Sequence, residues 1–246
     1  MRNGPAAAYQ PVIPPGSFAA TSPRQPRAEY TFAVSDMLEK RIGAVLLAAG
    51  AAARMGGRPK ALLELDGVPL VLRQLEALAG AGVDRRVIVL GSHAERILPL
   101  VERLPVSVVR NPRPDQGLVS SQRLGLAALT DVDALVVMLA DQPLLTAGDL
   151  ATLITEYRRR PDRILVPRVA GQPGNPVIFG AAIRRSILEG DDTLGCREWR
   201  ERNPETVRYF DSGNRAFVLD LDTLEDIRRF EQDTGRALRW PPGSQC

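Results

Sequence analysis

Short apolar runs alternate with amphipathic helical patterns along most of this chain, and no other feature limits its fold so strongly. The runs at Ile42–Ala48 and Ala134–Leu139 are continuous, as in parallel strands that are covered on both faces. Between such runs, residues like Leu150, Leu153 and Ile154 follow the i, i+3, i+4 spacing of one helical face. Strands that alternate with helices form βαβ units. The alternation of strand and helix patterns therefore predicts an α/β protein with a mostly parallel central sheet.

The pattern places these elements in one domain at residues 37–235. The expected strands are Ile42–Ala48, Arg86–Leu90, Val106–Arg110, Ala134–Leu139, Ile164–Val166, Pro176–Phe179, Val207–Phe210 and Phe217–Leu219. The expected helices are Leu70–Ala79, Ala94–Arg103, Val119–Leu129, Ala147–Arg159, Ala181–Leu188, Cys196–Arg202 and Leu224–Thr234.

The two ends of the chain differ from this domain in composition. Residues 1–36 hold six of the 20 prolines, mixed with Gly, Ser, Gln and Arg. Such a segment buries too little apolar surface to offset the entropy lost on ordering. We therefore expect a Pro-rich, disordered N-terminal extension, with Met37 as a candidate start, and a flexible tail at 236–246.

Charge and cysteine content exclude several classes of protein. The 32 basic and 29 acidic residues nearly balance, and no basic stripe suggests nucleic acid as a partner. No run approaches the roughly 20 apolar residues of a membrane span. Cys196 and Cys246 are the only cysteines, which favours a reducing compartment, and we expect a cytoplasmic protein. Lys40–Ala53 has the outline of a signal peptide, but the cations at Arg54 and Lys60 suit a phosphate loop better.

The stretch Ala44–Lys60, AVLLAAGAAARMGGRPK, is the most informative in the chain. A buried strand leads into a turn rich in Gly and Ala, where small residues let a ligand approach the backbone N–H groups. Arg54 offers a guanidinium fork and Lys60 a point charge for phosphate oxygens. Nucleotides often bind at the loop after the first strand of an open α/β sheet. A solvated glycine-rich turn is the alternative, because the sequence matches neither the dinucleotide fingerprint nor the P-loop.

The pattern LAAG-x-x-x-R-M-G-x-x-P-K, followed by ALLELDGVPLV, resembles the signature of the sugar-nucleotidyltransferase-like superfamily. Within it, the chain is most similar to the molybdenum cofactor nucleotidyltransferases. The resemblance implies a Rossmann-like three-layer α/β/α sandwich with a mostly parallel, mixed central sheet, as in the nucleotide-diphospho-sugar transferases. The residues implied to bind the nucleotide are Leu47, Ala48, Ala49, Gly50, Arg54, Lys60 and Ser121. Those implied to be catalytic are Arg54, Lys60 and Asp141.

Carboxylates follow two later apolar runs. Asp141 stands at the sheet edge where ligands bind, although an Asp before Pro143 is also an ordinary turn residue. The family resemblance implies that Asp141 coordinates a nucleotide-bound Mg²⁺, or Mn²⁺, and that Asp220 supplies the second metal contact. Asp222 and Thr223 can both cap the helix that follows, and we assign the cap to Asp222.

Other segments carry weaker signals. The segment Gln116–Ser121 resembles a family segment whose helix N-terminus lies near the nucleotide. Ser120 or Ser121 as a simple helix N-cap is an equally good interpretation. Gly174, Asn175 and Pro176 resemble a turn that borders the second substrate, and Asp191 a segment near the acceptor. On chemistry alone these are a tight turn and a helix cap.

Two further residues have structural rather than chemical interpretations. His93 is the only histidine, and we expect it to be an exposed residue at a helix start. Cys196 lies on a helical pattern and is expected in the core. The sequence has neither a G-x-S-x-G elbow nor a cluster of zinc ligands.

The resemblance implies an Mg²⁺-dependent nucleotidyltransferase, a molybdenum cofactor cytidylyltransferase that transfers CMP from CTP to the phosphate of a molybdopterin-type cofactor and releases pyrophosphate. CTP is favoured because residues 47–50 read LAAG, whereas guanylyl members more often read LAGG. A molybdenum hydroxylase or its accessory proteins would be the protein partners. The alternatives are a GTP-using or sugar-phosphate nucleotidyltransferase, an NAD(P)H-dependent oxidoreductase of the same family, and a non-catalytic accessory protein for the molybdenum cofactor.

Overall fold

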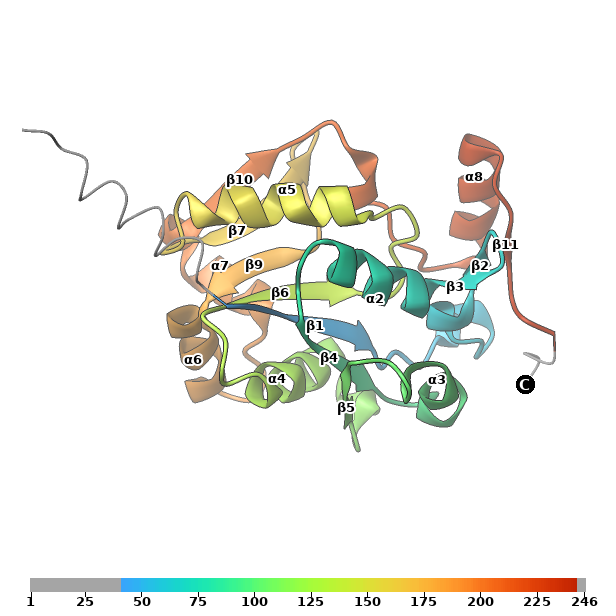
Figure 1. Ribbon diagram of the computed structural model, residues 1–246, viewed down its shortest axis with the longest axis horizontal. Coiled ribbons are helices and arrows are strands. Elements are labelled where there is room, and N and C mark those ends of the chain that lie inside the picture. The colour runs from blue at the N-terminus through green and yellow to red at the C-terminus, as the bar shows by residue number, and fades with distance from the viewer. Residues whose placement is uncertain (1–40, 243–246) are drawn as a thin grey trace, which may run out of the picture. The chain divides into compact units, whose positions relative to one another are not determined.

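The structure, a computed structural model, describes residues 41–242, so the extension expected at 1–36 lies outside the described residues. Its main sheet has the strand order β10-β7-β9-β6-β1-β4-β5, with β8 beside β7 (Figure 1). The strands of this sheet are β1 (Ile42–Ala48), β4 (Arg85–Leu90), β5 (Ser107–Arg110), β6 (Ala134–Leu139), β7 (Ile164–Val169), β8 (Gln172–Pro173), β9 (Val177–Gly180) and β10 (Val207–Asp211). Only the pairs that involve β9 or β8 are antiparallel. The sheet is therefore mixed and mostly parallel, as the sequence predicts.

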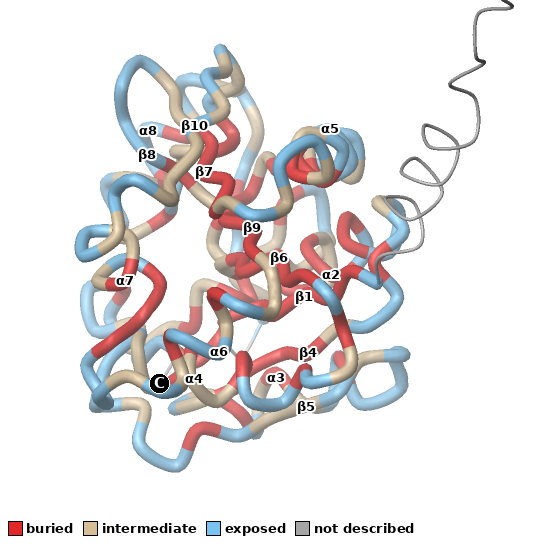
Figure 2. The backbone as a smooth tube through the Cα atoms, turned by 90° about the vertical axis from the view of Figure 1, so that its left-hand side faces the viewer, coloured by how far each residue is buried: buried red, intermediate tan, exposed pale blue. Residues whose placement is uncertain are grey.

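Strand β1 lies at the centre of the fold, and all seven of its residues are buried. Val45 pairs in parallel register with Val87 of β4 and Val137 of β6. Because side chains alternate along a strand, Leu46 and Leu47 belong to separate apolar clusters on the two faces of the sheet. Figure 2 shows the inner strands β1, β6 and β9 as the buried centre of the sheet.

Helices cover both faces of the sheet. On the face of Leu46 pack α2 (Leu70–Gly80), α3 (Ala94–Val101) and α5 (Ala147–Arg158). On the face of Leu47 pack α4 (Leu118–Ala128), α6 (Ala181–Glu189) and α7 (Cys196–Arg202). This arrangement confirms the predicted three-layer α/β/α sandwich. All six helices lie within two residues of their expected bounds.

A small second sheet lies beside the sandwich and holds the end of the domain (Figure 1). Its order is β11-β2-β3, from β11 (Leu238–Arg239), β2 (Glu64–Leu65) and β3 (Val68–Pro69). The last helix, α8 (Leu224–Thr234), packs against this sheet through a third apolar cluster. That cluster joins the segment after the Gly/Ala-rich loop to the C-terminal residues.

Two expectations differ from the structure. The strand expected at Phe217–Leu219 is absent from the described chain, where residues 215–217 form a 3-10 helix instead. The carbonyl of Phe217 accepts hydrogen bonds from Asn175 N (2.8 Å) and from Gln142 Nε2 (3.2 Å), rather than from a strand ladder. Residues 236–240, which the sequence placed in a flexible tail, include strand β11, and Leu238 is buried.

Across residues 41–242, no helix is both long and apolar enough to traverse a lipid bilayer.

Candidate active site

The loop after β1 follows a path fixed by backbone hydrogen bonds and one buried anchor. Ala52 is in the left-handed region (φ 54°), which is uncommon for a residue with a Cβ atom. Its carbonyl accepts from the N–H groups of Met55 (2.9 Å) and Gly57 (3.1 Å). Met55 is fully buried in the third apolar cluster. The sequence therefore folds the loop into a compact turn rather than an extended strap.

A cavity of about 690 Å³ lies at the carboxyl ends of β1 and β6. Its volume is within the range of sites for small-molecule ligands. All seven residues expected to bind a nucleotide line it, namely Leu47, Ala48, Ala49, Gly50, Arg54, Lys60 and Ser121. The two residues expected to hold a metal, Asp141 and Asp220, line it as well. The geometry thus brings the predicted nucleotide and metal residues to one cavity.

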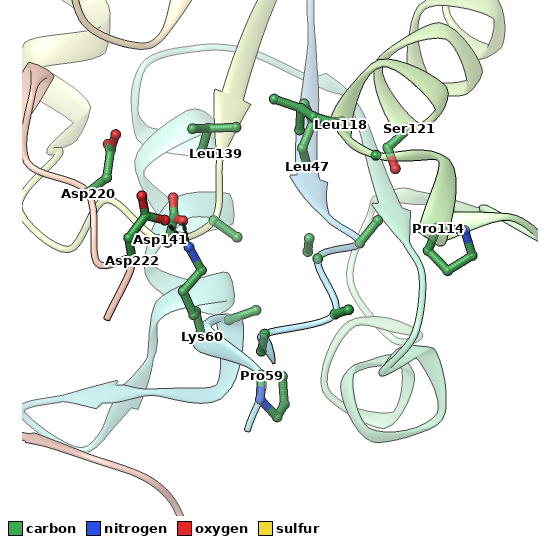
Figure 3. A pocket seen from close by; sticks show the side chains of 18 of the residues that line it. Leu47, Pro59, Lys60, Pro114, Leu118, Ser121, Leu139, Asp141, Asp220 and Asp222 are labelled. Atoms are coloured by element: carbon green, nitrogen blue, oxygen red, sulfur yellow. Dashed lines mark hydrogen bonds and ion pairs between the residues drawn. The ribbon is translucent and has the colours of Figure 1, made fainter. Parts of the chain in front are cut away.

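The cavity has an apolar side and a charged side (Figure 3). Leu47 and Leu118 lie on the apolar side, together with Ser121. Across the cavity, the ammonium of Lys60 points toward the carboxylates of Asp141 and Asp222. A ligand with an apolar ring at one end and negative charge at the other matches this division.

Lys60 is the central cation of the charged side. Its Nζ donates to Asp141 Oδ2 and, at 2.8 Å, to Asp222 Oδ1. Arg54 approaches the same Asp222 oxygen to 3.8 Å and remains largely exposed. Burial alone would lower the pKa of Lys60, but the charges and hydrogen bonds of Asp141 and Asp222 outweigh it and raise the pKa above its ordinary value. Lys60 is therefore charged at neutral pH.

Asp220 stands beside this group without a hydrogen bond to Lys60. Desolvation of the carboxyl by the protein around it, followed by the charges of Asp141 and Asp222, raises the pKa of Asp220 to about 6. The residue itself is exposed and opens onto the cavity. Three carboxylates outnumber the Lys60 ammonium and the exposed Arg54 guanidinium, and this excess of negative charge suits a further cation.

Backbone contacts explain why Asp220 and Asp222 come to the end of β6. The N–H of Leu221 donates to the carbonyl of Asp141 (3.2 Å). The side chain of Gln142, which is fully buried, donates to the carbonyl of Phe217. These two bonds tie the segment before α8 to the strand end that carries Asp141.

The cap expected at Asp222 is formed by its neighbour. Thr223 is the N-cap of α8, and its hydroxyl accepts from Asp226 N (3.2 Å). The Asp226 carboxylate accepts from Thr223 N (2.7 Å), which completes a capping box. The assignment of Asp222 to the cap was therefore wrong. Because the cap needs only Thr223 and Asp226, the Asp222 side chain is left to face Lys60.

The donor set fits a hard divalent cation. Asp141 Oδ1 is buried and has no hydrogen-bond partner, and Asp220 lies on the same cavity wall. Within residues 41–242, no three His, Cys, Asp or Glu side chains come together as a ready-made metal cage. Mg²⁺ does not need one, because it commonly takes one or two carboxylates together with substrate phosphates and water. Asp141 and Asp220 are the residues that would hold it.

Ser121 is fixed by a hydrogen bond rather than by a helix cap. The N-cap of α4 is Gly117, with φ 86°, so neither of the two serines caps this helix. Asn111 Nδ2 donates to Ser121 Oγ (2.9 Å) and to Ser120 Oγ (3.0 Å). Asn111 could not be predicted from the sequence, because a loop separates it from Ser120 and Ser121.

Other residues in the cavity wall were missed at the sequence level. Besides Asp222, they are Ala51, Ala52, Pro59, Ala61, Pro114, Gly117, Leu118, Leu139, Ala140 and Arg197. Arg197 comes from α7, and its guanidinium also pairs with Glu201 one turn later (3.0 Å). Arg123 of α4 holds the chain before α7 by donating to the carbonyls of Ile187 (2.6 Å) and Leu188 (2.9 Å). Only the spatial arrangement of α4, α6 and α7 brings Arg197 to the cavity.

The residues expected near an acceptor lie apart from this cavity wall. The Asn175–Pro176 bond is cis. A Cβ atom on Gly174 would come within 2.1 Å of the Phe217 carbonyl, so this position requires glycine. The turn therefore packs against the segment that leads to Asp220. A second cavity, of about 430 Å³, adjoins this region and shares Asp220 with the first.

Asp191 has a local role. It accepts hydrogen bonds from the N–H (2.9 Å) and hydroxyl of Thr193 and lies 3.5 Å from Arg202. These hydrogen bonds lower the pKa of Asp191. It lines neither of the two cavities.

The expectations for His93 and Cys196 agree with the structure in position. His93 is the N-cap of α3, as expected, but it is half-buried rather than exposed, and its Nε2 lies 3.2 Å from the carbonyl of Ala51 in the loop. Cys196 is buried among the apolar residues under α7, and burial raises the pKa of its thiol to about 12.

Comparison with known proteins agrees with this geometry. Residues 44–207 match the family described as MobA-like NTP transferase domain. The chain is 33% identical over 196 residues to nicotine blue oxidoreductase of Paenarthrobacter nicotinovorans, which covers 75% of this chain and 94% of that protein. It is 30% identical over 197 residues to the bifunctional protein GlmU of Thermus thermophilus, covering 75% of this chain but only 40% of GlmU.

A solved structure extends the likeness to the whole fold. Rv0371c from Mycobacterium tuberculosis has a TM-score of 0.68 and 26% identity, covering 78% of this chain and 98% of its own. Rv0371C has also been solved in complex with manganese. The family match spans more than half of the chain and includes the loop, Lys60 and Asp141. This chain therefore belongs to the family of MobA-like NTP transferase domains.

Proposed function

We propose that this protein is a nucleotidyltransferase that transfers CMP from CTP to the phosphate of a molybdopterin-type cofactor and releases pyrophosphate. The charged side of the cavity carries the proposal, since Lys60 and Arg54 lie there among carboxylates suited to a metal. Family membership supports the reaction class. The choice of CTP and of the acceptor rests on the resemblance of the loop sequence.

In the proposed reaction, the protein has to position the two substrates and neutralise the negative charge of their phosphates. An oxygen of the acceptor phosphate attacks the α-phosphorus of CTP, the bond to the bridging oxygen breaks, and pyrophosphate leaves. A phosphate monoester is largely dianionic at pH 7, so no base is needed to remove a proton. What remains is to hold the groups in line and to balance the charge of the leaving group.

Named residues can meet these needs. Lys60 can turn from Asp222 to the phosphates, and Arg54 can fork onto the same oxygens. Asp141 and Asp220 would hold Mg²⁺, or Mn²⁺, which takes the same oxygen ligands. The ion would supply charge neutralisation at the phosphate oxygens. Leu47 and the small residues after it would face the base and ribose.

The test is a substrate matrix with pyrophosphate release as the readout. The protein is incubated with Mg²⁺ and each of the four nucleoside triphosphates, with either molybdopterin cofactor or a sugar 1-phosphate as acceptor. We expect release with CTP and the pterin phosphate. Pyrophosphate release only with GTP, or only with the sugar phosphate, would show that the proposed nucleotide or acceptor is wrong. No release with any pair would overturn the transferase proposal and favour a non-catalytic carrier.

A second candidate function is oxidoreduction with NAD(P)H. The 33% identical relative that is aligned over nearly its whole length bears the name of an oxidoreductase. The loop of this chain lacks the dinucleotide fingerprint, and its Lys60 and Asp141 suit a metal-bound triphosphate better. Oxidation of NAD(P)H in the presence of a dye substrate, with no pyrophosphate release in the matrix above, would favour this function.

The proposal extends to partners and location. A dinucleotide cofactor has to be handed to an enzyme that uses it, so we propose a molybdenum hydroxylase or its accessory protein as the protein partner, in the cytoplasm. Co-purification of such an enzyme with the tagged protein tests the partnership.

A further inference from the structure

The C-terminal segment after α8 is fixed against the start of the domain. Strand β11 pairs antiparallel with β2, so that Leu238 faces Leu65. The Leu238 N–H also donates to Glu231 Oε1 (2.9 Å), and Arg236 forms an ion pair with Asp66. Leu238 itself is only 2% exposed. These contacts bring Trp240, the residue directly after β11, to a defined place.

Trp240 touches the loop that carries Lys60. Its indole Nε1 donates to the carbonyl of Pro59 (3.3 Å). The guanidinium carbon of Arg58 lies 4.0 Å from the centroid of the Trp240 ring, in cation–π geometry. One aromatic side chain therefore contacts the two residues that directly precede Lys60.

The contacts with Trp240 add to the loop's own hydrogen bonds at a point that follows two glycines. Gly56 and Gly57 both have positive φ, and glycine gives the backbone more conformational freedom than any other residue. Pro59 is the N-cap of the 3-10 helix that Lys60 begins, and both residues line the cavity. Any movement at Pro59 is passed directly to Lys60. Arg58 is turned to the indole and is not part of the cavity wall.

We infer that Trp240 is a positioning residue for nucleotide binding: by holding Arg58 and Pro59, it keeps Lys60 aimed at the charged side of the cavity. The inference rests on the proposed function, since it takes Lys60 to meet the nucleotide phosphates. Trp240 lies after residue 207, where the family match ends. The role is thus built from a part of the chain that the family match does not include.

The first experiment measures the flexibility of the loop in the absence of nucleotide. Hydrogen exchange is measured for peptides that cover residues 53–62 in the wild type, Trp240→Phe, Trp240→Ala and Trp199→Phe. Trp199 is the only other tryptophan; it is a buried residue of α7, and its indole donates to Ser186, so it is the matched control. We expect faster exchange in the loop of Trp240→Ala, with α2 and α5 unchanged, and no change in the control. Unchanged loop exchange would overturn the inference.

The second experiment reads nucleotide affinity. Trp240→Phe keeps a ring over Arg58 but loses the hydrogen bond to Pro59, whereas Trp240→Ala loses both contacts. We expect the Kd and KM for Mg-CTP to rise a few fold in the first and about tenfold in the second, with kcat changed less. Equal affinity in all variants would overturn the inference. If Trp240→Ala unfolds, Trp240→Phe decides the outcome.

A fluorescence titration separates this inference from the proposed function. In the Trp199→Phe background, Trp240 is the only tryptophan, so emission reports on its surroundings alone. We expect a saturable change in emission as Mg-CTP is added. Binding detected by calorimetry with no change in emission would contradict the inference and leave the proposed function intact. Failure of every nucleotide to bind, with faster loop exchange in Trp240→Ala, would overturn the proposed function and leave only a structural role for Trp240.

Discussion

Lys60 is the residue on which the charged side of the cavity depends, because it forms ion pairs with both Asp141 and Asp222. Charge-assisted hydrogen bonds contribute about 1.5–3 kcal/mol. Lys60→Ala should therefore weaken nucleotide binding roughly tenfold to a hundredfold, measured by calorimetry. Lys60→Arg, which keeps the charge, should lose much less. Unchanged affinity in Lys60→Ala would show that the loop does not hold the phosphates.

Asp141 provides the sharpest test of the metal site. Asp141→Asn keeps the shape of the side chain but removes the charge, so turnover and Mg²⁺-dependent nucleotide binding should be lost. The control is Asp131→Asn, which breaks a surface ion pair with Arg85 far from the cavity and should leave both unchanged. A near-normal rate of pyrophosphate release in Asp141→Asn would remove this carboxylate from the metal site.

The pKa of Asp220 gives a pH prediction for the nucleotide-free protein. The pKa rises from 3.8 to about 6 on folding, so the folded state binds this proton more tightly than the unfolded state does. The contribution to stability is therefore complete below about pH 4 and is lost as the pH rises through 6. Asp220→Asn should melt at a higher temperature than the wild type at pH 8, and the gap should close near pH 4.

Asp211 offers a control of opposite sign. Its hydrogen bond with Arg168 lowers the pKa of Asp211, so its stabilising effect is present at neutral pH and is lost in acid. Asp211→Asn should lower the melting temperature at pH 8 but not at low pH. The same pH profile in both variants would contradict the assigned causes.

At the scale of elements, α4 packs so closely on β1 that a side chain at Gly125 should destabilise the protein. A Cβ atom on Gly125 would lie 2.3 Å from a methyl group of Val45 and 3.0 Å from one of Val89. Gly125→Ala should therefore destabilise the protein by about 1–3 kcal/mol, measured by denaturant unfolding. Gly148→Ala on α5, where the nearest atom is 3.8 Å away, should be neutral or stabilising. Equal stability of the two variants would mean that α4 can shift without cost.

The elements show which patterns a sequence can reveal. The long runs of β1 and β6 and the helical stripe of α5 bury enough apolar side chains to be recognised from residue order alone. The two-residue strands β2, β3, β8 and β11 are too short to show a period. The run at Phe217–Leu219 is as apolar as a strand, but hydrogen bonds from distant residues give it another conformation.

The residues of the candidate site also fall into those that the sequence predicts and those that only the fold reveals. Lys60 was predicted as a cation of the loop after the first apolar run, and Asp141 by its place after a later run together with the family resemblance. The structure places both in the cavity wall. Asp222 was misassigned because Thr223 competes for the same cap, and only the fold shows which residue forms it. Arg197 reaches the cavity, and Asn111 reaches Ser121 in the cavity wall, through packing between helices and loops that no local pattern encodes.

At the scale of the whole molecule, nucleotide binding should stabilise the fold. A ligand present at 100 times its Kd adds about 2.7 kcal/mol to the free energy of unfolding. For a domain of this size that corresponds to a rise of roughly 5–10 °C in melting temperature. Thermal unfolding with Mg-CTP should show this rise in the wild type but not in Asp141→Asn. A rise of the same size in both proteins would place the ligand elsewhere.

The contacts around Lys60 also determine when the loop can reach its final structure during synthesis of the chain. Its bond with Asp222 spans 162 residues, and the bond between Trp240 and Pro59 spans 181. A chain that emerges from the ribosome N-terminus first makes the Gly/Ala-rich loop early and these partners last. The sheet can begin to assemble while synthesis continues, but the loop has to wait for Asp222 and Trp240. A chain released too early would therefore resemble the mature protein through most of its sheet and still lack a finished cavity.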